Sequence, residues 1–305
     1  MSTVPIYTGE SQAFSKVGIP RKTLNRRIIL DKIAKKLFLL ATLFALLILG
    51  ILIFRIWNQS IGWLNIKFLT SNLSIFPQKA GIKGVLLGSL WLMLIVAPIT
   101  LIIGVSTAIY LEEYATKGRL QEFIKINISN LAGVPSVIFG LLGLTVFGRL
   151  FHLGSSVLAG GLTMSLLVLP IVVVASQEAI KAVPNFLRDA SYAMGATKWI
   201  TMRTVVLPVA LPGILTGSIL ALSRAIGETA PLVVLGIPTL ILKVPTGIMD
   251  DFSALPIQIY YWTLDTVLTP EYANLAAATI LVLLVVLFLM NTTAIIIRNK
   301  FQKRY

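Results

Sequence analysis

The chain has 305 residues, of which 56% are hydrophobic and only 12% are charged, and its formal net charge is +14 at pH 7. Soluble domains carry roughly a quarter of charged residues, so this composition excludes an ordinary soluble protein and indicates an integral membrane protein. The sequence contains no cysteine, which excludes disulfides, thiolate nucleophiles and cysteine-based metal sites.

The positive charge has two possible partners, anionic lipid headgroups or nucleic acid. In this sequence the basic residues lie beside apolar segments and do not form a separate domain. We therefore expect membrane lipid, and not nucleic acid, as their partner.

The apolar residues form six continuous blocks. About 20 helical residues cross the hydrocarbon core of a bilayer, whereas a transmembrane β-barrel would show alternating strands of about ten residues. The predicted fold class is therefore all-α and polytopic, with six transmembrane helices. Because the first block follows a polar arm and has no small-residue cleavage site after it, we expect a retained anchor and not a secretory signal. The blocks are residues 37–57, 85–110, 126–148, 156–176, 208–236 and 273–297.

Lysine and arginine residues near the membrane ends predict that both termini face the cytoplasm. They are concentrated before the first block and after the last one. Residues 111–125 and 177–207 then lie on the cytoplasmic side, whereas 237–272, with four acidic residues against one lysine, lies outside. The expected parts are a basic cytoplasmic arm, a first helix with an outer linker, a helical core and a basic cytoplasmic tail, at residues 1–36, 37–83, 84–297 and 298–305. The basic residues of the tail are Arg298, Lys300, Lys303 and Arg304.

Residues that enzymes use for chemistry are scarce. His152 is the only histidine, which excludes a histidine-based triad and a multi-histidine metal site. The sequence also lacks the GxxxxGK[ST] phosphate loop, so any ATP must be hydrolysed by another polypeptide. We expect no metal, no cofactor and no enzymatic activity in this chain.

Two groups of charged residues lie in or beside the apolar blocks. Arg224 and Glu228 are spaced i and i+4 in the fifth block, so both project from one helical face and can pair. A charge inside a span costs about 2.5 to 3.5 kcal/mol, and an arginine there suits an oxyanion pathway. The alternative is a structural pair that snorkels outward, since Arg224 lies roughly 24 Å of helix beyond Pro208. Glu112 and Glu113 follow the second block, where acids are ordinary interfacial residues; contact with a partner is the other interpretation.

The segment Asp189–Pro208, DASYAMGATKWITMRTVVLP, is a polar, helix-forming island between two apolar blocks. We expect two short helices, broken near Pro184 and again near Gly195, with the next span starting at Pro208. Apolar and charged residues are interleaved in this island. Such a helix either lies flat on lipid or docks into a groove of a cytoplasmic partner.

The island resembles the EAA motif of ABC importer permeases, which reads EAA, three residues, glycine, nine residues, isoleucine, one residue and Leu-Pro. Every spacing is kept, although Asp replaces Glu, Ser replaces Ala and Val replaces Ile. The resemblance implies a type I importer permease fold, similar to MetI, and a coupling helix that docks on an ATP-hydrolysing subunit. The residues at the motif positions are Asp189, Ala190, Ser191, Gly195, Val205, Leu207 and Pro208.

Three further stretches, AIYLEEYA at 108–115, NLAGVPSVIFGLLGL at 130–144 and LPGILTGSILALSRAIGETAPL at 211–232, resemble PstA-type permeases of phosphate importers. This resemblance implies a subunit in the plasma (inner) membrane of a prokaryote that forms half of the translocation pathway. The implied partners are a PstC-type second permease, PstB-type ATPase subunits and a PstS-type phosphate-binding protein. Arg224 and Glu228 match charged positions that are proposed to act in phosphate passage.

Three alternatives stay open at this point. A permease for another oxyanion, such as molybdate or sulfate, would share the EAA motif. A secondary transporter or channel would usually show repeated halves, which the sequence does not. An intramembrane enzyme would need a catalytic dyad or a metal site.

Overall fold

The computed structural model describes residues 21–238, 240–241 and 243–301, and every regular element among them is helical. The predicted all-α class is therefore confirmed. The first 20 residues of the predicted arm, and Lys303 and Arg304 of the predicted tail, lie outside the described residues. The chain divides into two compact units, Met1–Arg55 and Ile56–Tyr305.

The first helix, α2, runs without a break over Arg21–Ser60. It continues through the basic segment into the first apolar block, because Leu, Ile, Ala, Lys and Arg are all good or tolerated helix formers. On its polar part, Lys35 pairs with Asp31 one turn earlier at 2.8 Å.

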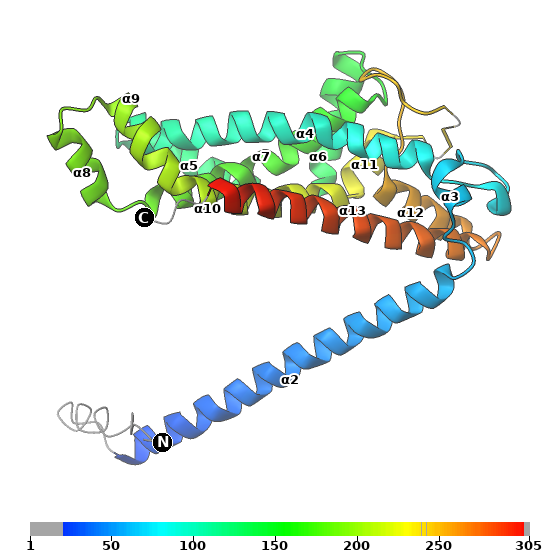
Figure 1. Cartoon of the computed structure of the whole chain (residues 1–305), viewed down its shortest axis with the longest axis horizontal. Coiled ribbons are helices and arrows are strands. Elements are labelled where there is room, and N and C mark those ends of the chain that lie inside the picture. The colour runs from blue at the N-terminus through cyan, green and yellow to red at the C-terminus, as the bar shows by residue number, and fades with distance from the viewer. Residues whose placement is uncertain (1–20, 239, 242, 302–305) are drawn as a thin grey trace. The chain divides into compact units, whose positions relative to one another are not determined.

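The second unit contains the remaining helices. Four of them, α4, α7, α10 and α13, run along its length, with α8 and α9 at one end and α3 and α12 toward the other (Figure 1). Wider π-helical turns follow α4, follow α6 and precede α10, over Tyr110–Tyr114, Gly143–Leu150 and Met202–Val206. The helix bounds are α3 (Ile66–Thr70), α4 (Lys83–Ile109), α5 (Arg119–Leu131), α6 (Ser136–Leu142), α7 (Val157–Lys181), α8 (Asn185–Ala193), α9 (Lys198–Thr201), α10 (Leu207–Gly227), α11 (Ala230–Leu235), α12 (Leu255–Asp265) and α13 (Tyr272–Phe301).

Most of the predicted membrane spans correspond to helices of the structure. Within the described residues, 5 helices are long and apolar enough to cross a membrane, and the number rises to 6 if one bent pair of helices counts as a span. The chain is thus polytopic as predicted. The five single helices are Arg27–Ser60, Lys83–Tyr114, Val157–Lys181, Lys198–Gly227 and Tyr272–Lys300.

The third predicted span, residues 126–148, corresponds to the bent pair of helices. It is divided between α5 and the helix that begins at Ser136, and the two are bent by 103°. Pro135 stands at the break, where it caps α6 and has no backbone N–H to donate to a preceding turn. It also disfavours helical geometry at Val134, so the helix cannot pass through this point.

The fifth predicted span, residues 208–236, also has different ends. The helix already begins at Lys198 and stops at Gly227, so Pro208 lies near the start of α10 and does not begin the span. Pro208 fits there because the π-helical turn precedes it, where the regular hydrogen-bond ladder is already interrupted. Glu228 then adopts extended backbone with φ −77° and ψ 124°, which separates α10 from the short helix α11.

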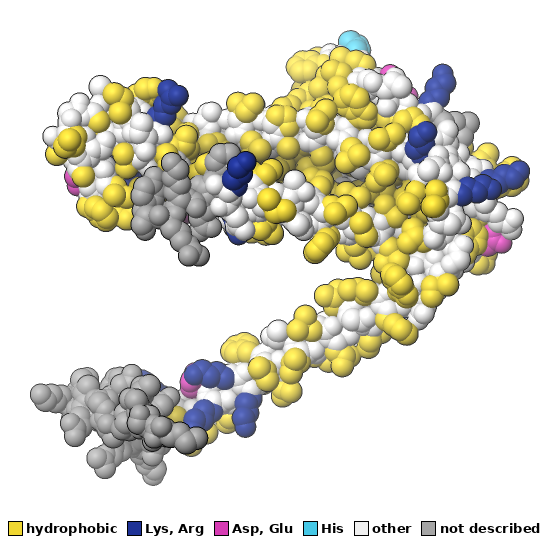
Figure 2. All heavy atoms as spheres, in the orientation of Figure 1, with side chains coloured by type: hydrophobic (Ala, Val, Ile, Leu, Met, Phe, Trp, Pro, Cys, Tyr) yellow, Lys and Arg dark blue, Asp and Glu magenta, His cyan; other side chains and the backbone are white. Residues whose placement is uncertain are grey.

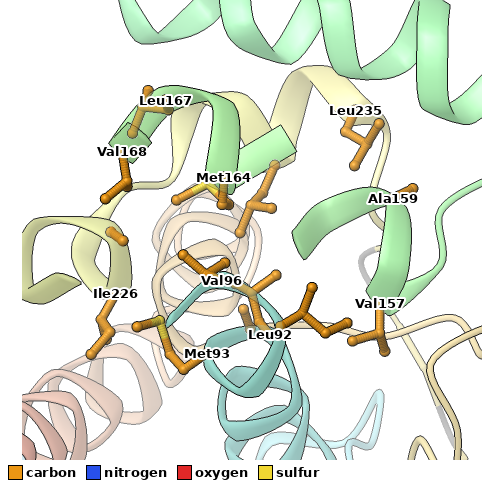
Figure 3. Packing of buried hydrophobic residues seen from close by; sticks show 14 of the residues in the cluster. Leu92, Met93, Val96, Val157, Ala159, Met164, Leu167, Val168, Ile226 and Leu235 are labelled. Carbon is orange, nitrogen blue, oxygen red and sulfur yellow. The ribbon is translucent and has the colours of Figure 1, made fainter. Parts of the chain in front are cut away.

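The core of the second unit lies mainly between α4 and α7. Figure 3 shows Leu92 and Val96 of α4 on the side that faces Met164 of α7, while Met93 lies toward Ile226 of α10. Burial of these side chains removes apolar surface from solvent and fixes the two helices against each other.

Other apolar side chains face outward. Figure 2 shows them along the sides of the second unit, with charged side chains near its two ends. Ile102, Leu220 and Phe288 are 67%, 68% and 70% exposed within the chain. Apolar surface of this extent is expected where lipid or neighbouring membrane helices replace water.

Candidate functional site

The predicted island forms a helical hairpin of α8 and α9. Gly195 separates the two helices and has φ +81°, a left-handed conformation in which glycine is favoured. Its N–H donates to the carbonyl of Tyr192 at 2.9 Å, which closes the end of α8. Thr197 then caps α9 by accepting a bond from the N–H of Ile200. The breaks expected near Pro184 and Gly195 are both present.

Some motif residues meet in this hairpin and others do not. Ala190, Ser191 and Val205 line one apolar hollow of about 570 Å³ between α8 and the helix that begins at Lys198. Asp189 and Gly195 are exposed, whereas Leu207 and Pro208 are half-buried at the start of α10. The other residues that line the hollow are Leu187, Met194, Ala196, Ile200, Thr204 and Val209.

The hairpin is internally braced but presents apolar side chains outward. The hydroxyls of Ser191 and Thr201 lie 2.9 Å apart and link α8 to α9. Phe186, Met194 and Trp199 are 68%, 88% and 61% exposed. A small, braced element with large exposed apolar side chains has the properties of a docking surface.

The anchor of the hairpin is Arg188, which the sequence analysis did not single out. Its guanidinium donates to Glu113 Oε1 from Nη2 at 2.9 Å and from Nε at 3.1 Å. It also donates to the carbonyls of Ile180 and Val183 at 2.9 and 2.6 Å, at the end of α7. Ile180 lies in the last turn of α7 and Val183 follows the end of this helix, so Arg188 adds side-chain donors to carbonyls at a helix C-terminus. Arg188 therefore joins α8 to both α4 and α7.

The residues Tyr110–Tyr114, here called the acidic turn, make further contacts. Glu112 pairs with Lys125 of α5 at 2.8 Å and accepts a bond from Gln177 of α7 at 3.1 Å. The ammonium of Lys198 lies 5.2 Å from the centre of the Tyr114 ring. Glu112 and Glu113 thus make contacts within this chain that the sequence did not predict.

The second predicted site lies at the other end of α10. Arg224 Nε and Glu228 Oε1 are 3.3 Å apart, and the two side chains are 54% and 20% exposed. Arg224 is in the last turn of the helix, where a positive charge interacts favourably with the helix dipole. Next to it, Ser223 donates a hydrogen bond to Asn291 of α13. The pair therefore marks a helix end, not the middle of a continuous span.

The structure separates the two predicted sites but connects them by one helix. The hairpin lies at the start of the helix Lys198–Gly227 (Figure 1), and Arg224 lies in the last turn of this helix. Pro208 and Arg224 are separated by about 24 Å of helix. Elsewhere in the described part of the chain, no three His, Asp or Glu side chains come together as a metal site.

Comparisons with known proteins agree with this architecture. The family model described as "Binding-protein-dependent transport system inner membrane component" matches residues 100–305. The chain is 35% identical over 290 residues to "Phosphate transport system permease protein PstA 1" of Mycobacterium tuberculosis (strain CDC 1551 / Oshkosh), covering 90% of each protein. It is also 35% identical over 210 residues to "Probable ABC transporter permease protein YqgI" of Bacillus subtilis (strain 168), covering 68% of this chain and 71% of the relative.

A solved structure shares the fold. The inward-facing MetNI methionine ABC transporter contains a chain that superposes with a TM-score of 0.58, covering 73% of this chain and 96% of that one. The sequence identity is 17%, so this similarity concerns the fold alone.

Proposed function

We propose that this chain, which belongs to the family of binding-protein-dependent transport system inner membrane components, carries phosphate as one permease subunit of an ABC importer. It is a multi-pass inner membrane protein without catalytic activity of its own. The observation that carries the choice of phosphate is the similarity over 90% of the chain to a permease named for phosphate transport. A PstA permease of Yersinia pestis, 31% identical over 88% of this chain, supports the same choice.

The family membership implies an ATPase and an external binding protein as partners. We assign these to the PstB and PstS types, and the second permease to the PstC type. In this proposal residues 84–297 form the permease core, the arm 1–36 and the tail 298–305 lie in the cytoplasm with both termini, and residues 37–83 form the first span and an outer linker.

The hairpin α8–α9 is the proposed docking site for the ATPase. Asp189 to Gly195 are presented outward beside an apolar hollow, which supports a groove-docking role. Because the helix from Lys198 extends through the π-helical turn to Gly227, a displacement of the hairpin reaches the Arg224 region. Alternating access then requires ATP-driven movement of the hairpin and no chemistry on phosphate.

Arg224 is the proposed transient anion site. Its side chain is 54% exposed and its guanidinium can donate to phosphate oxygens, while Glu228 at 3.3 Å competes for the same positive charge. This competition weakens anion binding. Weak binding is what a pathway needs, since an ion held too tightly cannot leave.

The test is the ATPase activity of the complete complex in proteoliposomes with a panel of oxyanions. We expect phosphate, presented with the binding protein, to stimulate ATP hydrolysis and to accumulate inside. Stimulation by sulfate or molybdate, with none by phosphate, would retain the importer permease and replace the cargo. Transport without any dependence on ATP would point to a secondary transporter.

A further inference from the structure

We infer that the acidic turn, Tyr110–Tyr114, receives the movement of the coupling hairpin and passes it to the helix bundle, with Glu113 as the positioning residue. This inference rests on the proposed coupling role of the hairpin. It adds a second route beside α10 and assigns a role to residues outside the EAA-type motif.

The acidic turn contacts the hairpin on both sides of Gly195. From α8, Arg188 makes two hydrogen bonds to Glu113, and from α9, Lys198 lies over the ring of Tyr114. Adjacent residues of one turn thus contact both helices of the hairpin. A movement of either helix displaces the same turn.

The acidic turn is also bound to α5 and α7. Glu112 contacts Lys125 of α5 and Gln177 of α7, at 2.8 and 3.1 Å. The carbonyl of Leu111 accepts a bond from Gln121, also in α5, and the Leu111 side chain is 2% exposed. A displaced turn therefore pulls on α5, which is the first half of the bent pair, and on α7.

The side chains that join the acidic turn to its neighbours have little contact with solvent. The side chains of Glu113 and Arg188 are 9% and 15% exposed, and that of Glu112 is 10% exposed. A poorly solvated carboxylate that loses its partner is left as an uncompensated charge. The pair consequently stays closed during a movement, and the two segments shift together.

The backbone of the acidic turn joins it directly to α4. It is π-helical and continuous with α4, and the N–H of Ala115 closes it on the carbonyl of Tyr110 at 2.8 Å. Single π-helical turns within helices are frequent at functional sites and interrupt the regular ladder. Since α4 packs along α7 through the core, a rotation at this turn is transmitted to the main helix pair.

The experiment compares phosphate uptake and ATP hydrolysis in the same proteoliposomes containing the complete complex. For Glu113→Gln we expect the amount of phosphate moved per ATP hydrolysed to fall about fivefold, the lower end of typical coupling between sites. Glu113→Asp keeps the charge and is expected to recover part of the ratio. Arg188→Lys keeps the charge but cannot serve both carbonyls and Glu113, so its ratio should fall as well.

The matched control is a different ion pair, Glu178 with Lys181, in the last turns of α7. Glu178 and Lys181 lie 2.7 Å apart, but they are 66% and 47% exposed and are bound to each other, not to the hairpin. We expect Glu178→Gln to leave the ratio unchanged. A similar fall in this control would mean that any loss of charge near α7 disturbs the complex, and the inference would be wrong.

The outcomes separate the inference from the function on which it rests. If Gly195→Leu uncouples the complex while Glu113→Gln assembles and keeps the wild-type ratio, the hairpin couples but the acidic turn does not transmit. If the wild-type complex moves no phosphate, the proposed function fails first. Should Glu113→Gln not assemble, Tyr114→Leu decides: a lowered ratio supports the inference, and an unchanged ratio overturns it.

Discussion

Gly217 of α10 faces Ala175 of α7 so closely that a Cβ atom on the glycine would lie 2.4 Å from the Cβ of Ala175. Gly213, one turn earlier, faces Ala179 in the same way, at 2.9 Å. The close approach of these helices is what holds α10 against α7.

We predict that Gly217→Ala lowers the thermal stability of the purified complex by forcing α7 and α10 apart, at a cost of about 1 to 3 kcal/mol. The check is the unfolding temperature in detergent, followed by the ligand-free ATPase rate. Gly227→Ala is the matched control, because nothing lies within 4 Å of a Cβ there. Equal stability of both variants would contradict the close packing, and Ala175→Gly in the Gly217→Ala background should restore it.

At Gly195 the backbone conformation, and not the space around a side chain, limits which residue fits. A Cβ at this position meets nothing within 4 Å, but φ is +81°, so Gly195→Ala strains the backbone by about 1 to 2 kcal/mol. We expect weaker binding of the ATPase subunits, measured by co-purification, and a smaller defect for Gly195→Asn, since asparagine tolerates this conformation. Gly62→Ala, with φ +85° and equally open space, imposes the same strain outside the hairpin. It should leave ATPase binding intact.

Arg224→Gln removes the positive charge of the proposed anion site and shortens the side chain by two atoms. We expect phosphate uptake to fall about tenfold or more, the size of one lost charge-assisted hydrogen bond. The control is Arg149→Gln, which removes an exposed arginine from the bent helix pair. Normal uptake by a normally assembled Arg224→Gln complex would remove Arg224 from the pathway.

We predict that Glu228→Gln strengthens the binding of phosphate at Arg224, whereas Arg224→Gln weakens it. Arg224 would keep its charge but lose the carboxylate at 3.3 Å, so it should hold oxyanions longer. Lower maximal uptake together with a lower half-saturating phosphate concentration is the expected result. An unchanged half-saturating concentration would show that Glu228 does not compete with the anion.

Asp250 provides a prediction about pH in a loop outside the helices that cross the membrane. Its carboxylate accepts bonds from the N–H and hydroxyl of Thr246 and from the N–H of Gly247, and the pKa of Asp250 is lowered chiefly by the bond from the Thr246 backbone. A lowered pKa favours the folded loop above the ordinary value of 3.8, and this contribution disappears as the pH falls through the folded pKa.

Hydrogen exchange at Thr246 and Gly247 is the measurement for Asp250. We expect protection of these amides near neutral pH and faster exchange, corrected for the intrinsic pH dependence, in strongly acidic buffer. Asp250→Asn should remove most of the pH dependence. Asp265→Asn, which changes an exposed acid at the end of α12, should leave it in place.

Hydropathy and motif spacing predict much of this molecule but not its tertiary contacts. The continuous apolar blocks predict a polytopic helical protein, and the spacing around Gly195 predicts the hairpin and its break. Pro135 signals a kink from sequence, but the 103° bend depends on how the two halves pack. Glu113 and Arg188 are 75 residues apart, and no periodicity links positions at such a distance. The signal available was chemical: Glu113 is an acid beside a span, and Arg188 is a base directly before the polar island.

The helix from Lys198 to Gly227 has 30 residues, so it is a rod of about 45 Å. Tilting a rod of that length by about 5° displaces its far end by about 4 Å, close to the width of a tetrahedral oxyanion. An angular change too small to repack the core would therefore be large enough to open or close a passage at the proposed anion site, Arg224. The two access states of such a permease can differ by little in most of the molecule and still exclude each other where the ion passes.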